Sequence, residues 1–325
     1  MDALYKKRTL ETVDYTPAAA VAAGQVLQLP DGRAAVAPSA IAAGVLGAVI
    51  VSGLVKVTKT ANIQFLAGGR VFWDHSDSAA HFRAVNDRDF YLGTTPADAA
   101  AADTTLTVDL NASQRVTVDA LAGPSVSVAV GTQALGGFLP PVVHGGSRAL
   151  QLTSTSEAQK VDILSVDAVA LASRPIFEGV FRVATNGSGS ASDFNIGLAN
   201  ATHASDAGAI TESAFLHTNG NDLNLYAESD DGTTEVAETD TTVDFAAGSA
   251  AADRVEVWID ARDPEDVQFY VNGVNVLPAT VFDISAATGP LKALAHYEKT
   301  TGTETGGPIY IDRMIIRTNV EAQAA

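Results

Sequence analysis

Apolar and polar side chains alternate every second residue in many short runs of this chain, which limits the folds open to it. Clear examples are residues 105–110, 255–260 and 267–271. A period of two places successive side chains on opposite faces of a β-strand, whereas a helix needs a period near 3.6. Asn272-Gly273 follows the third run, and this dipeptide favours the tight turn of a β-hairpin. Because few runs have helical periodicity, the sequence predicts an all-β fold.

The strand-like runs fall into two groups, and a length of 325 residues is typical of two domains. Residues 13–111 predict a small β-barrel or compact sandwich. Residues 149–320 predict a larger antiparallel jelly-roll β-sandwich. We expect residues 112–148 to form a connector, residues 1–12 an N-terminal arm and residues 321–325 a short tail. No repeat relates the two halves. The expected connector is marked by Gly123-Pro124, Gly136-Gly137, Pro140-Pro141 and Gly145-Gly146.

Acidic residues are concentrated in the second half of the chain. The whole sequence has 20 Lys and Arg against 38 Asp and Glu, a net charge of −18. Residues 1–122 have a net charge of −2 and residues 123–325 a net charge of −16. This balance argues against binding nucleic acid over a broad face, which needs clustered Lys and Arg. The near-neutral first half is suited to lie against another protein. An acidic composition adapted to a salty habitat is the alternative, and both stay open.

The sequence has none of the common patterns of catalytic, metal or cofactor sites. Cysteine is absent, which excludes disulfides, thiol nucleophiles and Cys-based metal centres. No two histidines have the i, i+4 spacing of a helical zinc site, and there is no nucleophile elbow, P-loop or dinucleotide fingerprint. Acidic residues crowd two expected loops, 230–235 and 260–266, without the ligand spacing of a calcium loop. We therefore expect no metal, no cofactor and no enzymatic activity.

One uncharged stretch, residues 34–55, is long enough to span a bilayer. It contains Pro38 and three glycines, and it passes directly into the strand-like alternation of residues 55–58. We interpret it as buried strands and turns and expect no membrane association. The basic residues near the N-terminus are not followed by the apolar core of a secretory signal.

Glu256, Trp258 and Asp260 lie on one face of an expected strand. Two carboxylates beside an aromatic ring resemble a sugar-binding surface. Residues i and i+4 of a strand are about 13 Å apart, which is too far for the carboxylate pair of a glycosidase. Glycan binding by these three residues is therefore an alternative to a plain solvent face or domain contact, and glycoside cleavage is disfavoured.

Residues 10–110 contain an ordered series of short motifs. They are Val13-Asp14-Tyr15-Thr16-Pro17, Val21-Ala22-Ala23-Gly24-Gln25-Val26, Ile41-Ala42-Ala43-Gly44, Gly47 with Val49, Gly53-Leu54-Val55, Val71-Phe72-Trp73-Asp74, Gly93-Thr94 and Asp103-Thr104-Thr105-Leu106-Thr107-Val108. In this series the first hundred residues resemble the small capsid decoration, or cement, proteins of tailed phages. The resemblance implies a β-rich fold, assembly as trimers on the shell, and no enzymatic activity.

The second half resembles a concanavalin-like (laminin-G-like) jelly-roll sandwich over residues 149–318. This resemblance implies a fold and not a function, because lectins, enzymes and inert structural modules share it. The acidic catalytic signature of its glycosidases is not found here. The resemblance is carried by Phe177-Glu178-Gly179-Val180-Phe181, residues 255–260, Val267-Gln268-Phe269-Tyr270-Val271-Asn272-Gly273 and Tyr310-Ile311-Asp312-Arg313.

Together, these features lead us to expect a virion protein that is made in the host cytoplasm and coats the outer surface of an assembled head. The expected partners are the major capsid protein and, in a homotrimer, two further copies of the chain. The acidic sandwich is expected to project outward. The alternative is an adhesin or lectin that binds a cell-surface glycan. The arm residues expected to bind the capsid are Leu4, Tyr5, Lys6, Lys7, Arg8 and Leu10.

Overall fold

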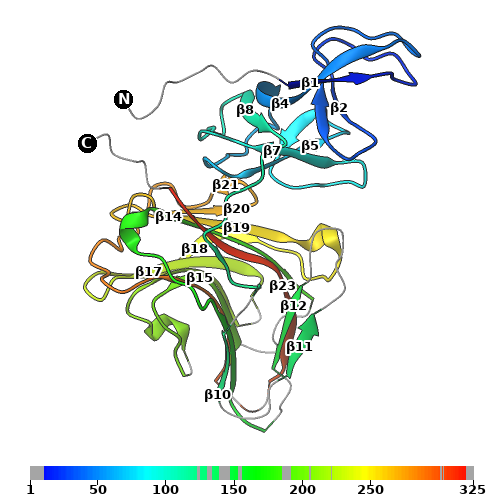
Figure 1. The fold of residues 1–325 in the computed structure, drawn as a ribbon. Helices are drawn as coiled ribbons and strands as arrows, with labels where there is room; N and C mark the ends of the chain where they lie inside the picture. The colour runs from blue at the N-terminus through cyan, green and yellow to red at the C-terminus, as the bar shows by residue number, and fades with distance from the viewer. Residues whose placement is uncertain are drawn as a thin grey trace. The chain divides into compact units, whose positions relative to one another are not determined.

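The computed structural model confirms the all-β class. It divides the chain into two compact units, unit 1 (Met1–Arg115) and unit 2 (Val116–Ala325) (Figure 1). Helical structure in the described part of the chain is limited to three short 3₁₀ turns, η1 (Leu171–Ser173), η2 (Ala207–Ala209) and η3 (Ala251–Asp253), and none of them is long enough to cross a membrane. The structure describes residues 11–122, 125–129, 134–138, 147–152, 156–184, 192–204, 206–220, 222–300, 302 and 304–319.

Unit 1 is built from one antiparallel sheet with the order β2-β3-β4-β8-β7-β5-β6, in which β1 also pairs with β4. The first half of the twelve-residue strand β4 pairs with β1 and β3, and its second half pairs with β8. The strands are β1 (Glu11–Tyr15), β2 (Val26–Gln28), β3 (Ala34–Val36), β4 (Gly47–Thr58), β5 (Arg70–Asp74), β6 (Ala79–His81), β7 (Phe90–Thr94) and β8 (Thr105–Leu110).

Unit 1 contains the same arrangement of strands twice. We name residues 11–52 lobe A and residues 53–111 lobe B. Lobe A pairs β1 with the first half of β4, β2 with β3, and β3 with β4. Lobe B pairs the second half of β4 with β8, β5 with β7, and β7 with β8. The strands therefore correspond in order, β1 to the second half of β4, β2 to β5, β3 to β7 and the first half of β4 to β8. Strand β6 is an addition in lobe B.

The backbone hydrogen bonds repeat as well. Val21 and Ile41 exchange two bonds of 2.9 Å in lobe A, and Phe65 and Ala99 exchange bonds of 3.0 and 2.9 Å in lobe B. The next bonds also correspond, from the N–H of Gly24 to Ala37 O (2.8 Å) and from the N–H of Gly68 to Thr95 O (2.7 Å). Both glycines have φ near +78°, which favours a residue without Cβ. We name residues 17–25 with 37–46 the turn pair of lobe A, and residues 61–69 with 95–104 the turn pair of lobe B.

One side chain at the end of β8 ties lobe B to lobe A. Asn111 accepts a hydrogen bond from the N–H of Ala34 (2.9 Å) and donates to Ala34 O (2.8 Å) and Val51 O (2.7 Å). Each lobe has its own buried side chains. Those of lobe A include Val21, Leu29, Ile41, Val49 and Val51, and those of lobe B include Phe65, Val71, Leu92, Leu106 and Val108.

Unit 2 is an antiparallel sandwich of two sheets. The first sheet has the order β10-β13-β22-β15-β16-β17-β18, and the second has the order β11-β12-β23-β14-β19-β20-β21, with β9 paired to β23. Its core lies between them, for example Val161, Ile163 and Phe194 of the first sheet with Phe177 and Val257 of the second. The strands are β9 (Val118–Asp119), β10 (Ser125–Ala129), β11 (Ala134–Phe138), β12 (Arg148–Leu152), β13 (Gln159–Leu164), β14 (Pro175–Val183), β15 (Ser192–Ala199), β16 (Ser213–Asn219), β17 (Asn224–Asp230), β18 (Glu235–Asp244), β19 (Val255–Asp260), β20 (Gln268–Val271), β21 (Val274–Asn275), β22 (Lys292–Lys299) and β23 (Gly306–Thr318).

The structure differs from the expectation of a loose connector over residues 112–148. Strands β9, β10 and β11 fall within this span and pair with β23, β13 and β12. Gly136-Gly137 interrupts the register of β11 without ending the strand, because a bulge absorbs the extra residue. The Gly136-Gly137 pair, which indicated a loop in the sequence, therefore forms a bulge within a sheet.

Candidate functional site

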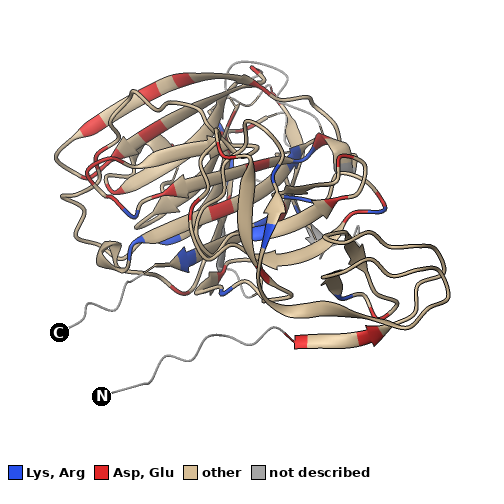
Figure 2. Ribbon diagram, turned by 90° about the horizontal axis from the view of Figure 1, so that it is seen from above, with Lys and Arg blue, Asp and Glu red and all other residues tan. Residues whose placement is uncertain are grey.

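Lobe A has almost no charge. Between residues 16 and 55 the only charged side chains are Asp31 and Arg33. These two lie at a turn and pair with each other, with 2.8 Å between Arg33 Nε and Asp31 Oδ2. The backbone N–H and the side chain of Arg33 hold the pKa of Asp31 below its ordinary value. Figure 2 shows how sparsely charged residues are distributed over this part of the ribbon compared with the sandwich. Beyond β1, which carries Glu11 and Asp14, lobe A therefore has only two charges, and these cancel.

The turn pair of lobe A places apolar side chains in water. Leu46 is 65% exposed and Val45 is 52% exposed. The two segments run side by side, joined by the Val21–Ile41 bridge and by a bond of 2.8 Å from the N–H of Gly44 to Pro17 O. Exposed alanines surround these residues at positions 18, 19, 20, 22, 23, 42 and 43. Large apolar side chains are ordinarily buried, and a group of them in water is typical of a contact surface.

The corresponding turn pair of lobe B carries acids at its turns. Asp98 Oδ1 accepts a hydrogen bond of 2.7 Å from the N–H of Ala67, and Asp103 Oδ2 accepts one of 2.7 Å from the N–H of Ala100. In lobe A, the amide oxygen of Gln25 accepts from the N–H of Ala22 at 2.9 Å. One backbone arrangement is thus stabilised by carboxylates in one lobe and by a neutral amide in the other.

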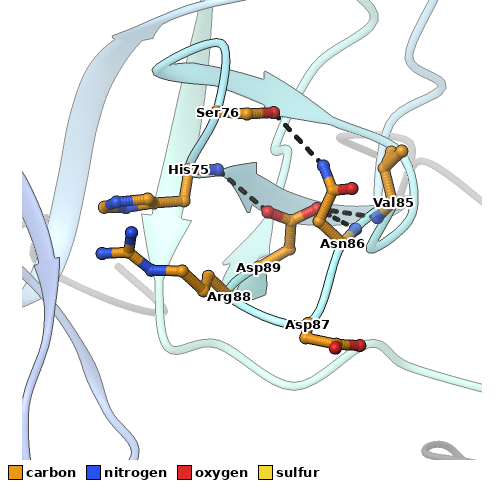
Figure 3. A pocket seen from close by; sticks show the side chains of 7 residues that line it. All are labelled: His75, Ser76, Val85, Asn86, Asp87, Arg88 and Asp89. Atoms are coloured by element: carbon orange, nitrogen blue, oxygen red, sulfur yellow. Dashed lines mark hydrogen bonds between the residues drawn. The ribbon is translucent and has the colours of Figure 1, made fainter.

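A shallow cavity of about 480 Å³ lies between two loops of lobe B, lined by His75, Ser76, Val85, Asn86, Asp87, Arg88 and Asp89 (Figure 3). One of its two acids, Asp89, is held by the loop itself. Asp89 accepts hydrogen bonds from the backbone N–H groups of His75 (2.9 Å), Val85 (2.7 Å) and Asn86 (2.7 Å). The side chains of His75 and Arg88 lie side by side and point away from that carboxylate. This arrangement orders a loop and brings no base to a nucleophile.

The expected arm residues, Leu4, Tyr5, Lys6, Lys7, Arg8 and Leu10, lie outside the described residues. The chain enters the described part at Glu11, the first residue of β1. Strand β1 pairs with β4, and among the described strands it has no partner along its other edge. The arm therefore leads directly into an edge strand of lobe A.

The three residues considered for glycan binding lie on β19, opposite the core residues of that strand. Trp258 is 6% exposed, and its indole N–H donates to Glu256 Oε1 at 3.1 Å. Asp260 pairs with Arg262, with 2.6 Å between Asp260 Oδ2 and Arg262 Nη2. The polar atoms of this group are thus engaged within unit 2.

The acidic loops expected from the sequence are held by backbone amides. Asp231 accepts hydrogen bonds from the N–H groups of Thr233, Thr234 and Ala286. Burial raises the pKa of Asp231, but these bonds outweigh burial and hold the pKa below its ordinary value. In the described part of the chain, no group of three His, Asp or Glu side chains is placed to hold a metal ion.

Sequence reasoning missed a buried charged cluster in unit 2. His296, on β22, is fully buried; its Nδ1 lies 2.5 Å from Asp162 Oδ1 and its Nε2 lies 2.7 Å from Glu298 Oε2. Burial lowers the pKa of His296, but the two carboxylates raise it more. Lys160 pairs with Asp162 from the other side. Two cations therefore balance two carboxylates, which identifies a structural network. Only strand pairing could have located it, because Asp162 and His296 lie opposite each other on β13 and β22.

A second buried pair lies two strands further along the same sheet. His217 Nε2 is 3.9 Å from Glu228 Oε2. Burial lowers the pKa of His217 to about 4. Burial, together with repulsion from Asp206, Glu238 and other carboxylates, raises the pKa of Glu228 to about 7. As pH rises from about 4 to about 7, the shift of His217 increases the stability of unit 2 and the shift of Glu228 decreases it.

Several solved structures resemble this chain, each at 16% identity or less. A protein of unknown function from Shewanella oneidensis MR-1 has 16% identity and a TM-score of 0.44, covering 62% of this chain and 81% of that one. The carbohydrate recognition domain of Emp46p in its potassium-bound form has 11% identity and a TM-score of 0.36, with 60% and 89% covered. A carbohydrate esterase from the Shiga toxin-encoding bacteriophage phi24B has 13% identity and a TM-score of 0.35, with 60% and 90% covered.

No curated protein matches this chain. The match that bears on the site is to a family model, and it covers a third of the chain. Its limits nearly coincide with those of unit 1 and enclose both lobes. The resemblance expected from the sequence is therefore confirmed: residues 7–112 are similar to the phage cement protein family.

Proposed function

We propose that this protein decorates the outer surface of an assembled phage head and attaches through unit 1. The observation that carries the proposal is the match of residues 7–112 to the phage cement protein family, which coincides with a separately compact unit. A protein that binds only the assembled lattice shifts the equilibrium toward assembly by mass action. The partner is the major capsid protein, and attachment stabilises the shell.

The division of charge between the units supports this arrangement. Unit 1 has 10 Lys and Arg against 11 Asp and Glu, whereas unit 2 has 10 against 27. A nearly neutral unit can approach a protein surface without strong repulsion. A strongly acidic unit repels its copies and stays solvated, which suits the side facing the medium. Neighbouring copies on one lattice would therefore keep their sandwiches apart.

Strand addition is the proposed role of the N-terminal arm. The arm leads into β1, whose outer edge has no partner among the described strands. An extended segment can pair with a free edge through main-chain hydrogen bonds. Leu4, Tyr5 and Leu10 would supply apolar anchors, and Lys6, Lys7 and Arg8 would pair with acids of the shell. A trimer around local three-fold axes would let three arms act together and add avidity.

The decisive experiment mixes the purified full chain with shells assembled from the virus's coat protein in the absence of this chain. We expect the protein to sediment with the shells at a fixed stoichiometry and to raise their melting temperature. If all of the protein stays in the supernatant at every ratio of protein to shells, the proposal is refuted.

The arm is tested by deleting residues 2–11 and measuring occupancy on the same shells. We expect weaker occupancy that depends less on salt than that of the full chain, because part of the arm's contribution is ionic and salt screens it only while the arm is present. Unchanged occupancy would remove the arm from the mechanism. Light scattering of the free protein checks the trimer in solution.

Glycan binding through Glu256, Trp258 and Asp260 stays the alternative. It predicts signals on a glycan array that disappear in Trp258→Ala. If the array shows no glycan binding and the protein still binds shells, decoration is the function. Turnover of a polysaccharide would favour an enzyme instead.

A further inference from the structure

We propose that the turn pair of lobe A is the face that rests on the shell, and that the shell surface beneath it is uncharged and apolar. This inference rests on the proposed function and names the attachment surface and its partner's chemistry. The face consists of residues 17–25 and 37–46, with Val45 and Leu46 as its most prominent side chains.

The duplication in unit 1 provides an internal comparison. Lobe A (residues 11–52) carries four charged side chains and lobe B (residues 53–111) carries seven when the addition around β6, residues 75–89, is left out. The contrast lies in the turn pairs: that of lobe A has no charged residue, whereas that of lobe B has Asp98 and Asp103. Both lobes have the same strand pairings and the same bonds across their turn pairs. Because lobe B folds with acids on this framework, the framework itself does not require an uncharged turn pair in lobe A. We attribute the uncharged turn pair to contacts outside the lobe.

The two turn pairs differ at the positions that protrude most. The N–H of Val45 donates to Ala42 O at 3.1 Å, and the N–H of Asp103 donates to Ala100 O at the same distance in lobe B. Val45 and Leu46 therefore correspond to Asp103 and Thr104. Lobe B has an acid and a hydroxyl where lobe A has two apolar side chains. Burying this face of lobe A against a partner therefore has a favourable free energy.

Other exposed apolar residues of unit 1 lie among charges. Leu54 and Val85 are each 52% exposed. Leu54 is two residues from exposed Lys56, and Val85 is two residues from Asp87 along the chain. The turn pair of lobe A contains no charged residue itself, although exposed Asp14 of β1 lies opposite Ala48, two residues from Leu46.

The shell fits this face better than a second copy of the chain does. A second copy of the chain carries the same net charge of −18 as the first. Like charges of this size oppose association at low salt. The free edge of β1 belongs to the same lobe, so the arm and the turn pair would attach to one surface together.

The test substitutes Leu46→Glu and compares it with Thr104→Glu, which makes the same change at the corresponding position of lobe B. Binding of each full-length variant to coat-protein shells is measured by co-sedimentation from about 0.05 to about 1 M NaCl. Because a carboxylate would be desolvated in an apolar contact, we expect Leu46→Glu to weaken binding by about tenfold or more. Thr104→Glu should stay within about twofold of the unsubstituted protein at each salt concentration. The roughly tenfold difference between Leu46→Glu and the unsubstituted protein should persist at high salt, where the ionic contribution of the arm is screened.

Each outcome separates the inference from the proposed function. If the unsubstituted protein does not bind shells, the proposed function fails. If it binds and Leu46→Glu binds equally well, or if both variants lose binding equally, the docking face proposed here is wrong. Circular dichroism checks that Leu46→Glu is folded, and Leu46→Ser provides a milder variant that should weaken binding less. A change in oligomeric state of the free Leu46→Glu protein would assign the face to a second copy and overturn the proposal.

Discussion

Asn111 is the side chain on which the joining of the two lobes depends most. Its amide makes three hydrogen bonds to the backbone of lobe A, at 2.7 to 2.9 Å. Two of them satisfy the N–H and C=O of Ala34, which is fully buried, so water cannot replace them. Asn111 itself has φ +58°, a conformation that Asn tolerates better than other residues with a Cβ. Asn111→Ala removes the three hydrogen bonds, while the alanine must still adopt the positive φ of this position.

The expected cost follows from these contacts. A neutral hydrogen bond contributes about 1 kcal/mol net, so three contribute about 3 kcal/mol. Placing Ala in the left-handed region adds about 1 kcal/mol. Asn111→Ala should therefore destabilise unit 1 by about 4 kcal/mol. Asn62→Ala is the matched control, because Asn62 has φ +62° in the same unit and is exposed. Its expected cost is only the backbone contribution of about 1 kcal/mol.

The two tryptophans make the measurement specific, because Trp73 lies in unit 1 and Trp258 lies in unit 2. In a Trp258→Phe background, the fluorescence of Trp73 reports unfolding of unit 1 in urea. Free energies of unfolding for Asn111→Ala and Asn62→Ala are compared with the background protein. If the two variants differ by less than about 1 kcal/mol, the three side-chain bonds do not join the lobes in the way described.

Other predictions concern a carboxyl in unit 2 and two glycines in unit 1. The raised pKa of Glu228, about 7, means that its contribution to stability is complete below its ordinary value near 4.5 and is lost as pH rises through 7. His217, whose pKa of about 4 lies below its ordinary value of 6.5, changes the stability of unit 2 in the opposite direction over nearly the same pH range. A His217→Gln background therefore isolates Glu228: unit 2 should then lose up to about 3 kcal/mol between pH 4.5 and about 7, and adding Glu228→Gln should abolish that loss in urea titrations at several pH values. Gly44→Ala meets no atom within 4 Å but has φ +70°, so it should destabilise unit 1 by only about 1 kcal/mol in the Trp73 assay. Gly93→Ala would place its Cβ 2.1 Å from Asp109 O and should prevent unit 1 from folding, as seen in its circular dichroism.

Strands with strict alternation could be predicted from the sequence with accurate limits. Residues 105–110 and 255–260 coincide with β8 and β19. The hairpin at Asn272-Gly273 is also confirmed, since both residues have positive φ, at +49° and +78°. These features are local: each follows from side chains within a few residues of one another.

Features that depend on pairing between distant strands were missed. The duplication in unit 1 is recorded in backbone hydrogen bonds, and these leave little trace in sequence, because Val21-Ala22-Ala23-Gly24 and Phe65-Leu66-Ala67-Gly68 share only two residue types. The network around His296 joins residues more than 130 positions apart. Strand β11 was missed because the glycines and prolines near it indicated a loop, whereas it pairs with β12. Strand β10 overlaps the strand-like run of residues 126–130, but its pairing with β13 could not be predicted.

The comparison between the lobes also indicates which features of the lobe A turn pair serve binding and not folding. In lobe B, carboxylates accept the turn hydrogen bonds at Ala67 and Ala100, and a charged acceptor makes a bond roughly twice as strong as a neutral one. The positions of lobe A that correspond to Asp98 and Asp103 are Ala40 and Val45, whose side chains accept no hydrogen bond. Folding alone would favour the charged caps in both lobes. Lobe A lacks them and keeps Val45 and Leu46 in water as well, two departures in the same direction. An uncharged partner surface accounts for both at once, because a carboxylate at the turn would be desolvated on docking while the apolar side chains would become buried.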